Sequence, residues 1–268
     1  GATLPPMSLP LDRLPIRALE PDFRERLPLG PVVLTAPTGS GKSTLVPLWC
    51  VQPGTRTLVV EPRRVACRAL YRFLAAQGAP VGYAVRHEQE APDAPLVFVT
   101  PGVAARLHAE TGLQEFRCVV VDEFHERRMD VDLLLALLRE QRERLGLVVM
   151  SATLDVRRVA TWLDAARLEG NARTHPVERH HLGDVEIPST RGLTDRVVAG
   201  VQQALRLTDE GDVLVFLPGK GEIRDAEQAL SRGREPVLPL HAGLPRREQD
   251  RVFEPCADRR IILSTNVA

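Results

Sequence analysis

The chain has 268 residues, and 35 lysine and arginine side chains balance 35 aspartate and glutamate side chains, so its formal net charge is zero. With 44% hydrophobic and 26% charged residues, it has the composition of an ordinary soluble globular protein. The excess positive charge that marks many nucleic-acid-binding proteins is absent, so charge alone indicates no such partner. Its apolar runs are too short to span a membrane, and no signal-peptide pattern is visible at its start.

Four cysteines are scattered along the chain, and none forms a Cys-x-x-Cys pair; they are Cys50, Cys67, Cys118 and Cys256. This spacing predicts free thiols rather than a disulfide framework or a zinc site. Free thiols are typical of a reducing compartment, so we expect a cytoplasmic protein.

Short β-rich runs recur in the first part of the chain, each ending at a turn or helix signal, at residues 32–35, 58–61, 96–100, 118–122 and 147–151. Continuous apolar runs of this kind indicate strands buried on both faces, as in a parallel sheet. Amphipathic stretches at 64–77 and 130–144 alternate with them, which predicts a doubly wound α/β fold. We assign this pattern to a first domain over residues 14–175, preceded by a Pro-rich, flexible N-terminal extension, 1–13.

A polar segment without periodicity follows, and we interpret residues 176–194 as a connector. A second α/β domain is predicted over residues 195–268, with helices at 194–207 and 222–230 and strands at 213–217, 237–240 and 261–265. The sequence ends directly after the last of these strands, so we expect the second domain to be incomplete.

A glycine-rich segment, Thr-Ala-Pro-Thr-Gly-Ser-Gly-Lys-Ser-Thr at 35–44, lies between the first predicted strand and a helix. This is the context of a P-loop, whose backbone N–H groups and helix N-terminus bind phosphate oxygens. Lys42 would contact the β- and γ-phosphates of ATP, and the Ser43 hydroxyl would bind Mg²⁺. Ala36 departs from the strict pattern, which has glycine there. The nucleotide-binding candidates are Thr38, Gly39, Ser40, Gly41, Lys42, Ser43 and Thr44.

Two carboxylates, Asp122 and Glu123, follow the fourth of the apolar runs. Ligands of α/β sheets bind at the carboxyl ends of strands, so Asp122 and the phosphate loop could share one crevice. Asp122 would hold Mg²⁺ through its waters, and Glu123 would orient or deprotonate the attacking water. Alternatively, the two acids merely begin a solvated turn. Ser151 and Thr153, after the fifth run, equally fit a helix N-cap when taken alone.

Together these residues resemble superfamily 2 helicases, and specifically the DEAH-box branch. The phosphate loop resembles motif I, residues 61–66 motif Ia, 100–102 motif Ib, 151–153 motif III, 216–219 motif IV and 261–268 the first half of motif V. Asp-Glu-Phe-His at 122–125 resembles motif II, and with the following Glu126 and Arg127 it is similar to bacterial HrpB-type helicases. Pro101 departs from the family, which usually has an acidic residue there.

The resemblance implies two RecA-like lobes with parallel sheets that bind ATP and Mg²⁺ between them. It implies catalytic roles for Lys42, Asp122, Glu123 and His125. Ser151 and Thr153 would couple the nucleotide state to the second lobe. Arg72 and Phe253 would sandwich the base, although a solvated arginine and a core phenylalanine fit these two positions equally well.

The same resemblance implies a single-stranded nucleic-acid partner, with RNA favoured over DNA. Aromatic residues make up only 4% of the chain, which favours contacts to the sugar–phosphate backbone over a stacking platform. The candidate contacts are Arg63, Arg64, Thr100, Gly102, His241, Gly243, Thr265 and Asn266.

The family's arginine fingers lie in a motif VI, beyond motif V, and the sequence ends inside motif V. We therefore expect the N-terminal part of a longer ATP-dependent helicase, which binds nucleotide but by itself hydrolyses it slowly and does not unwind duplexes. The alternative is a nucleotide-dependent clamp that grips nucleic acid without turnover. A P-loop kinase is a third reading, but it would need neither the second domain nor the segment 151–153.

Overall fold

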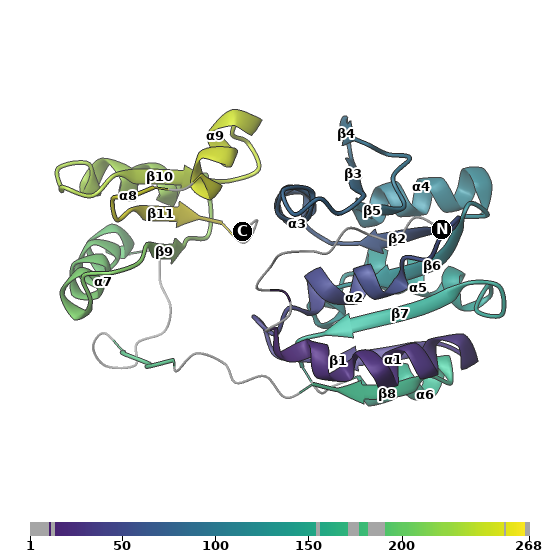
Figure 1. Ribbon diagram of the computed structural model, residues 1–268. Helices are drawn as coiled ribbons and strands as arrows, with labels where there is room; N and C mark the ends of the chain where they lie inside the picture. The colour runs from purple at the N-terminus through teal and green to yellow at the C-terminus, as the bar shows by residue number, and fades with distance from the viewer. Residues whose placement is uncertain are drawn as a thin grey trace. The chain divides into compact units, whose positions relative to one another are not determined.

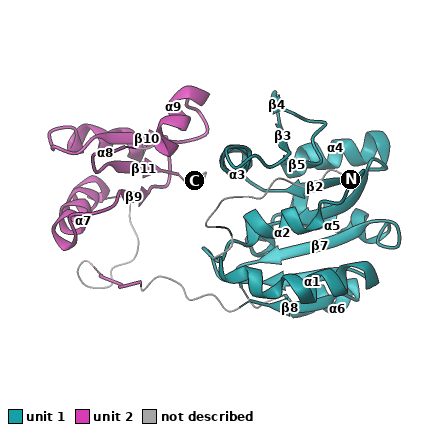
Figure 2. Cartoon of the chain, viewed as in Figure 1, with its two compact units in different colours: residues 1–176 teal, residues 177–268 magenta. Residues whose placement is uncertain are grey.

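The structure is a computed structural model, and it describes Leu11 and residues 14–153, 156–170, 177–181, 191–254 and 256–265. The chain divides into two compact units, residues 1–176 and 177–268 (Figure 1, Figure 2). Most of the expected connector lies outside the described residues. Its part at 177–181 has no regular secondary structure, and the first helix of the second unit begins at Leu193.

An eight-stranded sheet in the order β4-β3-β5-β2-β6-β7-β1-β8 forms the centre of unit 1. Neighbouring strands are parallel except for the β3–β4 hairpin. The five predicted strands are confirmed within two residues as β1, β2, β5, β6 and β7, whereas β3, β4 and β8 were not predicted. The strands are β1 (Val32–Thr35), β2 (Arg56–Val60), β3 (Val81–Val85), β4 (Glu88–Glu90), β5 (Leu96–Val99), β6 (Phe116–Val121), β7 (Gly146–Ser151) and β8 (Ala166–Glu169).

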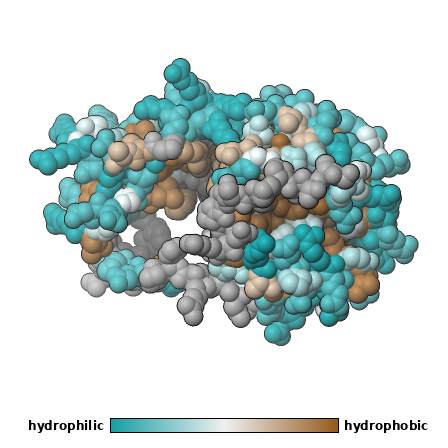
Figure 3. Space-filling model, in the orientation of Figure 1, coloured by the Kyte–Doolittle hydropathy of each residue, from teal (hydrophilic) through white to brown (hydrophobic). Residues whose placement is uncertain are grey.

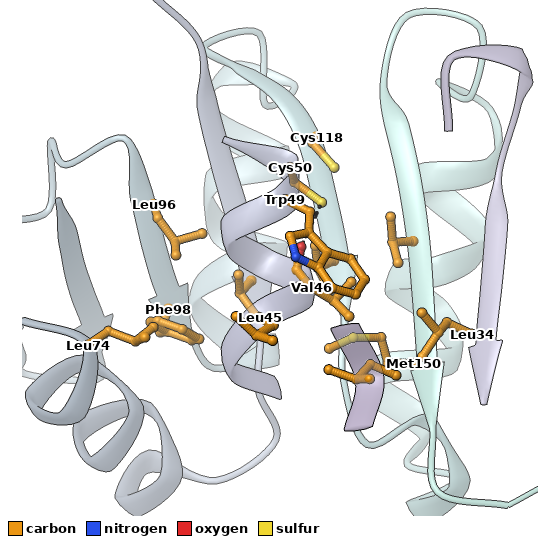
Figure 4. Packing of buried hydrophobic residues seen from close by; sticks show 14 of the residues in the cluster. Leu34, Leu45, Val46, Trp49, Cys50, Leu74, Leu96, Phe98, Cys118 and Met150 are labelled. Carbon is orange, nitrogen blue, oxygen red and sulfur yellow. Dashed lines mark hydrogen bonds between the residues drawn. The ribbon is translucent and has the colours of Figure 1, made fainter. Parts of the chain in front are cut away.

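Helices cover both faces of this sheet. Its central strands are buried on each side: Val120 belongs to one apolar cluster, and its neighbours Val119 and Val121 belong to the other. Helices α1, α2 and α3 pack on the first cluster, part of which Figure 4 shows, and α4, α5 and α6 pack on the second. The helices are α1 (Glu20–Arg26), α2 (Lys42–Cys50), α3 (Arg64–Ala75), α4 (Pro101–Thr111), α5 (Met129–Arg139) and α6 (Arg157–Leu163), with 3₁₀ turns η2 (Pro15–Leu19), η3 (Leu27–Leu29) and η4 (Phe124–Glu126).

The N-terminal region differs from the expected flexible extension at the one residue of 1–13 that the structure describes. Leu11 is buried in the same cluster as Ile16 and Phe23. The Phe23 ring lies 5.4 Å, centroid to centroid, from the ring of Trp49 on α2. The core of unit 1 therefore includes at least one apolar side chain of this Pro-rich stretch, that of Leu11.

Unit 2 contains a three-stranded parallel sheet in the order β10-β11-β9. Its predicted strands and helices are confirmed within about two residues, and the short helix α9 was not predicted. The elements are α7 (Leu193–Leu207), β9 (Val213–Phe216), α8 (Lys220–Leu230), β10 (Val237–Leu240), α9 (Arg246–Asp250), η5 (Arg251–Phe253) and β11 (Ile261–Ser264).

Figure 3 shows hydrophilic residues over much of the visible surface of each unit. In the described part of the chain, every helix is too short or too polar to cross a bilayer. Three cysteines, Cys50, Cys67 and Cys118, are buried and Cys256 is exposed, and all four are free thiols, as the spacing predicts.

Candidate active site

The phosphate loop connects the end of β1 to the start of α2 and turns on two glycines. Gly39 has φ +80° and Gly41 has φ +90°, a region of the backbone map that residues with a Cβ rarely adopt. A Cβ on Gly41 would also lie 2.6 Å from the Leu14 side chain. The Thr44 hydroxyl donates a hydrogen bond of 2.8 Å to the Gly41 carbonyl, which steadies the first turn of α2. Thr38 lies in the exposed part of the loop.

Lys42 is the first residue of α2, and its side chain turns inward. The residue is only 3% exposed, and its ammonium lies 3.3 Å from Oε1 of Glu123. A buried cation requires a partner, and here the carboxylate of Glu123, which follows β6, provides it. Ser40 is buried as well, and its hydroxyl has no hydrogen-bond partner in the described structure. The loop thus contributes an ammonium that is paired with Glu123 and a buried hydroxyl without a hydrogen-bond partner among the described residues.

Asp122 follows β6, whose neighbour β7 pairs in turn with β1, so the carboxyl ends of these strands lie side by side. The residue is 1% exposed, and Oδ1 accepts a 2.7 Å hydrogen bond from the Glu123 N–H. Burial and the nearby Glu123 carboxylate raise the pKa of Asp122 to about 6, while the Ser43 hydroxyl and the Lys42 ammonium act in the opposite direction. Asp122 therefore retains appreciable affinity for a proton near neutral pH.

The donor set at Asp122 fits a hard divalent cation. Asp122 Oδ2 is buried and has no hydrogen-bond partner in the described structure, and the Ser43 hydroxyl acts on the same carboxylate. The described residues contain no group of three or more metal-binding side chains. Mg²⁺ is usually bound through one or two carboxylates and takes its remaining ligands from waters and substrate phosphates, so Asp122 and Ser43 would suit it.

Glu123 adopts a left-handed backbone conformation, with φ +51°, that is uncommon for a residue other than glycine. Its two carboxylate oxygens have different partners, Lys42 Nζ at 3.3 Å and His125 Nε2 at 3.3 Å. Nδ1 of His125 accepts a 3.3 Å hydrogen bond from the Ala152 N–H, so Nε2 carries the ring proton. These contacts offset the cost of the strained backbone, which is on the order of 1–3 kcal/mol.

The segment 151–153 connects the end of β7 to both neighbouring strand ends. Ser151 is fully buried, and its carbonyl accepts a 3.1 Å hydrogen bond from the Ala36 N–H in the phosphate loop. Its hydroxyl accepts a 3.3 Å hydrogen bond from the N–H of Thr153, which is exposed. Through Ala36 and His125, the end of β7 therefore contacts both the phosphate loop and the loop that carries Glu123.

Asp122→Asn is expected to stabilise the metal-free, nucleotide-free protein. Because the folded-state pKa of Asp122 is about 6 and the ordinary value is 3.8, the wild type loses stability as pH rises through this interval. The variant should therefore gain about 1–3 kcal/mol in the free energy of unfolding above pH 6 and nothing below about pH 4. Chemical denaturation of unit 1 across this pH range measures the difference.

Asp130→Asn is the matched control, and we expect it to change the free energy of unfolding in the opposite direction. The Arg128 guanidinium hydrogen-bonds to Asp130 and lowers the pKa of that carboxyl, so its removal should destabilise the fold slightly above the ordinary aspartate pKa. Equal losses of stability in both variants would contradict the interpretation that the charge of Asp122 is unfavourable in the metal-free protein.

Three of the predicted nucleic-acid contacts line one cavity of about 810 Å³ in unit 1. Arg64 begins α3, and Thr100 and Gly102 lie at the start of α4. Arginines that no motif indicated also line this cavity, which we call the arginine groove. These are Arg86, at the turn between β3 and β4, Arg106 on α4 and Arg128 before α5.

Two further residues, Glu61 and Glu126, lie in segments that the sequence matched to motifs, but no local pattern gave either of them a role. Glu61 follows β2 and, by strand register, lies beside Asp122. It is buried, and its pKa is raised well above the usual range by burial and by the Asp122 and Glu123 carboxylates.

Glu126 forms an ion pair with Arg63, in which Arg63 Nη2 and Glu126 Oε1 are 2.6 Å apart. Arg63 is not among the residues that line the arginine groove. Arg72 is exposed in the last turn of α3.

The remaining candidates lie in unit 2. His241 and Thr265 follow the adjacent strands β10 and β11, and Nδ1 of His241 accepts a 3.1 Å hydrogen bond from the Gly243 N–H. Burial, with the Lys220 and Arg224 charges, lowers the pKa of His241. Phe253, at the end of η5, is 46% exposed, so it is not a core residue. Asn266 lies outside the described residues.

The parallel sheet and the phosphate loop, which contacts Glu123 next to the buried Asp122, define a nucleotide-binding α/β protein of the P-loop class. Residues 26–162, half of the chain, match the family model of the DEAD/DEAH box helicases. The chain belongs to this family, and the predicted fold class of two α/β units with parallel sheets is confirmed.

Known proteins that resemble the chain include several named helicases. The ATP-dependent RNA helicase HrpB of Escherichia coli K12 is 37% identical over 96% of this chain and 34% of its own length. HrpA of the same organism is 33% identical over the whole chain and 22% of its own length. A crystal structure of the Escherichia coli DEAH/RHA helicase HrpB superimposes with a TM-score of 0.80 at 34% identity, over 95% of this chain and 35% of that structure. The chain thus spans about a third or less of the length of these relatives.

Proposed function

We propose that the protein containing this chain is an ATP-dependent RNA helicase of the DEAH-box type. The observation that carries the proposal is the contact between Lys42 of the phosphate loop and Glu123, next to the buried Asp122. These side chains are of the types needed to bind phosphates, hold a cation and activate water. The named relatives support RNA as the polymer and ATP as the nucleotide.

In this mechanism, the backbone N–H groups of residues 38–44 and the N-terminus of α2 bind the phosphates of ATP. Lys42 leaves Glu123 and neutralises charge on the β- and γ-phosphates. Mg²⁺, held by Ser43 and Asp122, would supply further positive charge to those phosphates. Glu123, freed from Lys42, accepts a proton from the attacking water.

His125, Ser151 and Thr153 couple the hydrolytic site to the rest of the molecule. His125 joins Glu123 to the backbone at Ala152, so a shift at the end of β7 is transmitted to the catalytic carboxylate. Arg72 and Phe253 remain the candidates for stacking on the base. Exposure of both side chains is compatible with that role.

RNA is proposed to contact the arginine groove through its sugar–phosphate backbone. Arg64, Thr100 and Gly102 line this groove, and arginine is well suited to bind phosphate oxygens in pairs. In unit 2, the proposed contacts are His241, Gly243, Thr265 and Asn266. The four free thiols agree with a cytoplasmic location.

ATP hydrolysis by the full-length protein, measured with and without single-stranded RNA, tests the proposal. We expect RNA to accelerate hydrolysis more strongly than a DNA oligonucleotide of the same sequence. We also expect ATP-dependent separation of an RNA duplex that carries a single-stranded overhang. Binding of RNA without hydrolysis under any condition would instead support the nucleotide-dependent clamp.

A further inference from the structure

Arg63 and Arg64 are consecutive, but their side chains have different surroundings. Arg64 is exposed and lines the arginine groove. The Arg63 guanidinium instead lies 2.6 Å from Oε1 of Glu126, and the two side chains are only 33% and 23% exposed. The Arg63 N–H also donates to Oε1 of the buried Glu61, 3.3 Å away. The sequence motif places both arginines on the nucleic acid, whereas the structure directs one of them towards the loop that follows Asp122.

That loop extends from the hydrolytic site to the arginine groove within a few residues. At one end, Glu123 contacts Lys42 and His125. At the other end, Arg128 and its partner Asp130 line the arginine groove. Glu126, the partner of Arg63, lies between these ends. The ion pair is therefore attached on both sides to residues of the groove, Arg64 next to Arg63 and Arg128 two residues after Glu126.

The loop also has a conformation that its own sequence does not favour. Glu123 and Arg127 have φ values of +51° and +48°, and neither is glycine. Such conformations persist only where surrounding contacts hold them. Besides the contacts of Glu123 with Lys42 and His125 and of Arg127 with Asp132, three further contacts do so here. Phe124 is buried, the Arg127 guanidinium lies 5.3 Å from the centre of its ring, and Arg63 holds Glu126. Of these, only the ion pair joins the loop to the segment that carries Arg64.

We propose that the Arg63–Glu126 ion pair transmits the presence of nucleic acid in the arginine groove to the catalytic carboxylate of Glu123. The inference rests on the proposed function and assigns Arg63 a role as a positioning residue rather than as a contact to nucleic acid. A strand that engages Arg64 and Arg128 favours one placement of the segments on either side of the pair. Because Arg63 holds Glu126, a shift of the segment that carries Arg64 also shifts the loop from Glu123 to Arg128. The orientation of the Glu123 carboxylate changes with that loop. A ligand that binds two such arrangements unequally shifts the equilibrium between them.

The test compares Arg63→Ala with Arg64→Ala in the full-length protein. For each variant, ATP hydrolysis is titrated with single-stranded RNA, and RNA affinity is measured separately by fluorescence anisotropy. Arg63→Ala should lower the maximal RNA-stimulated rate about tenfold, a typical size for coupling between sites, and leave RNA affinity within about twofold. Arg64→Ala should instead weaken RNA affinity about tenfold, the loss of one good ionic contact.

A charge exchange separates coupling from simple loss of structure. Arg63→Glu and Glu126→Arg each place like charges together and should each lower the stimulated rate at least as much as Arg63→Ala. The double variant restores the opposite charges and should recover most of the stimulation. Arg63→Lys keeps the positive charge and should recover part of the RNA-stimulated rate. Such a recovery would show that the alanine variant loses the ion pair and not merely its folded structure.

Other outcomes overturn the inference. If Arg63→Ala weakens RNA affinity as Arg64→Ala does, Arg63 contacts the nucleic acid. If basal and stimulated rates fall in parallel and the charge exchange recovers neither, the pair is only structural. If RNA does not accelerate ATP hydrolysis by the wild-type protein, the proposed function is refuted and this inference with it. If RNA does accelerate hydrolysis by the wild type but the Arg63 variants show one of the two results just described, only the inference is refuted.

Discussion

Lys42→Ala is expected to weaken ATP binding about a hundredfold and to abolish hydrolysis. The substitution removes a buried ammonium whose charge-assisted hydrogen bonds to phosphate oxygens are worth about 1.5–3 kcal/mol. It also leaves Glu123 without the partner that lies 3.3 Å away in this structure. Affinity for a fluorescent ATP analogue, measured by equilibrium titration, reports the first effect, and single-turnover hydrolysis reports the second.

The composition of the chain makes a sharper version of this experiment possible. Of its 35 basic residues, 33 are arginine and only Lys42 and Lys220 are lysine. Lys42→Arg keeps the charge but brings a planar fork into a site that holds a compact ammonium, so we expect little recovery of ATP binding. Lys220→Arg, in unit 2, is the matched control and should bind ATP like the wild type. Normal ATP affinity in Lys42→Arg would show that charge alone suffices in the loop.

Glu123→Gln is expected to slow ATP hydrolysis by about a thousandfold, within the range contributed by a general base, and to preserve ATP binding. Glutamine has nearly the same shape but cannot accept the proton of the attacking water. It also removes the carboxylate that competes with the phosphates for Lys42, so ATP affinity should stay the same or increase. Single-turnover hydrolysis and nucleotide titration measure the two effects separately in the full-length protein.

Glu169→Gln, on the edge strand β8, provides the control for loss of a surface carboxylate and should hydrolyse ATP at the wild-type rate. If Glu123→Gln also hydrolysed ATP at the wild-type rate, Glu123 would not be the base. The clamp would be the better description of the protein only if the wild type itself bound RNA without hydrolysing ATP.

Much of the fold could be predicted because its strong signals are local. Apolar runs such as Val119–Val121 remain buried on both faces, so the positions of five strands and their parallel pairing followed from these runs and their alternation with amphipathic stretches. The phosphate loop could also be predicted from its local sequence, because Gly39 and Gly41 occupy backbone conformations that favour glycine. The Asp122–Glu123 pair could be placed near this loop because the ends of parallel strands meet at one edge of the sheet.

The features that could not be predicted depend on tertiary contacts. The pairing of Arg63 with Glu126 joins residues 63 positions apart, and no spacing rule distinguishes Arg63 from Arg64. Arg86 reaches the arginine groove only because a short antiparallel hairpin, β3–β4, extends the sheet at its edge. Leu11 looked like part of a Pro-rich tail, but it fills the core beside Phe23.

The distribution of thiols has a practical consequence for observing this protein at work. Cys256 of unit 2 is the single exposed cysteine of the four, and burial raises the pKa of the Cys67 thiol well above its usual range, which disfavours the reactive thiolate. A maleimide dye should therefore attach at one defined position of this chain without prior mutagenesis. Fluorescence from that position would follow the environment of unit 2 in real time as ATP and RNA are added.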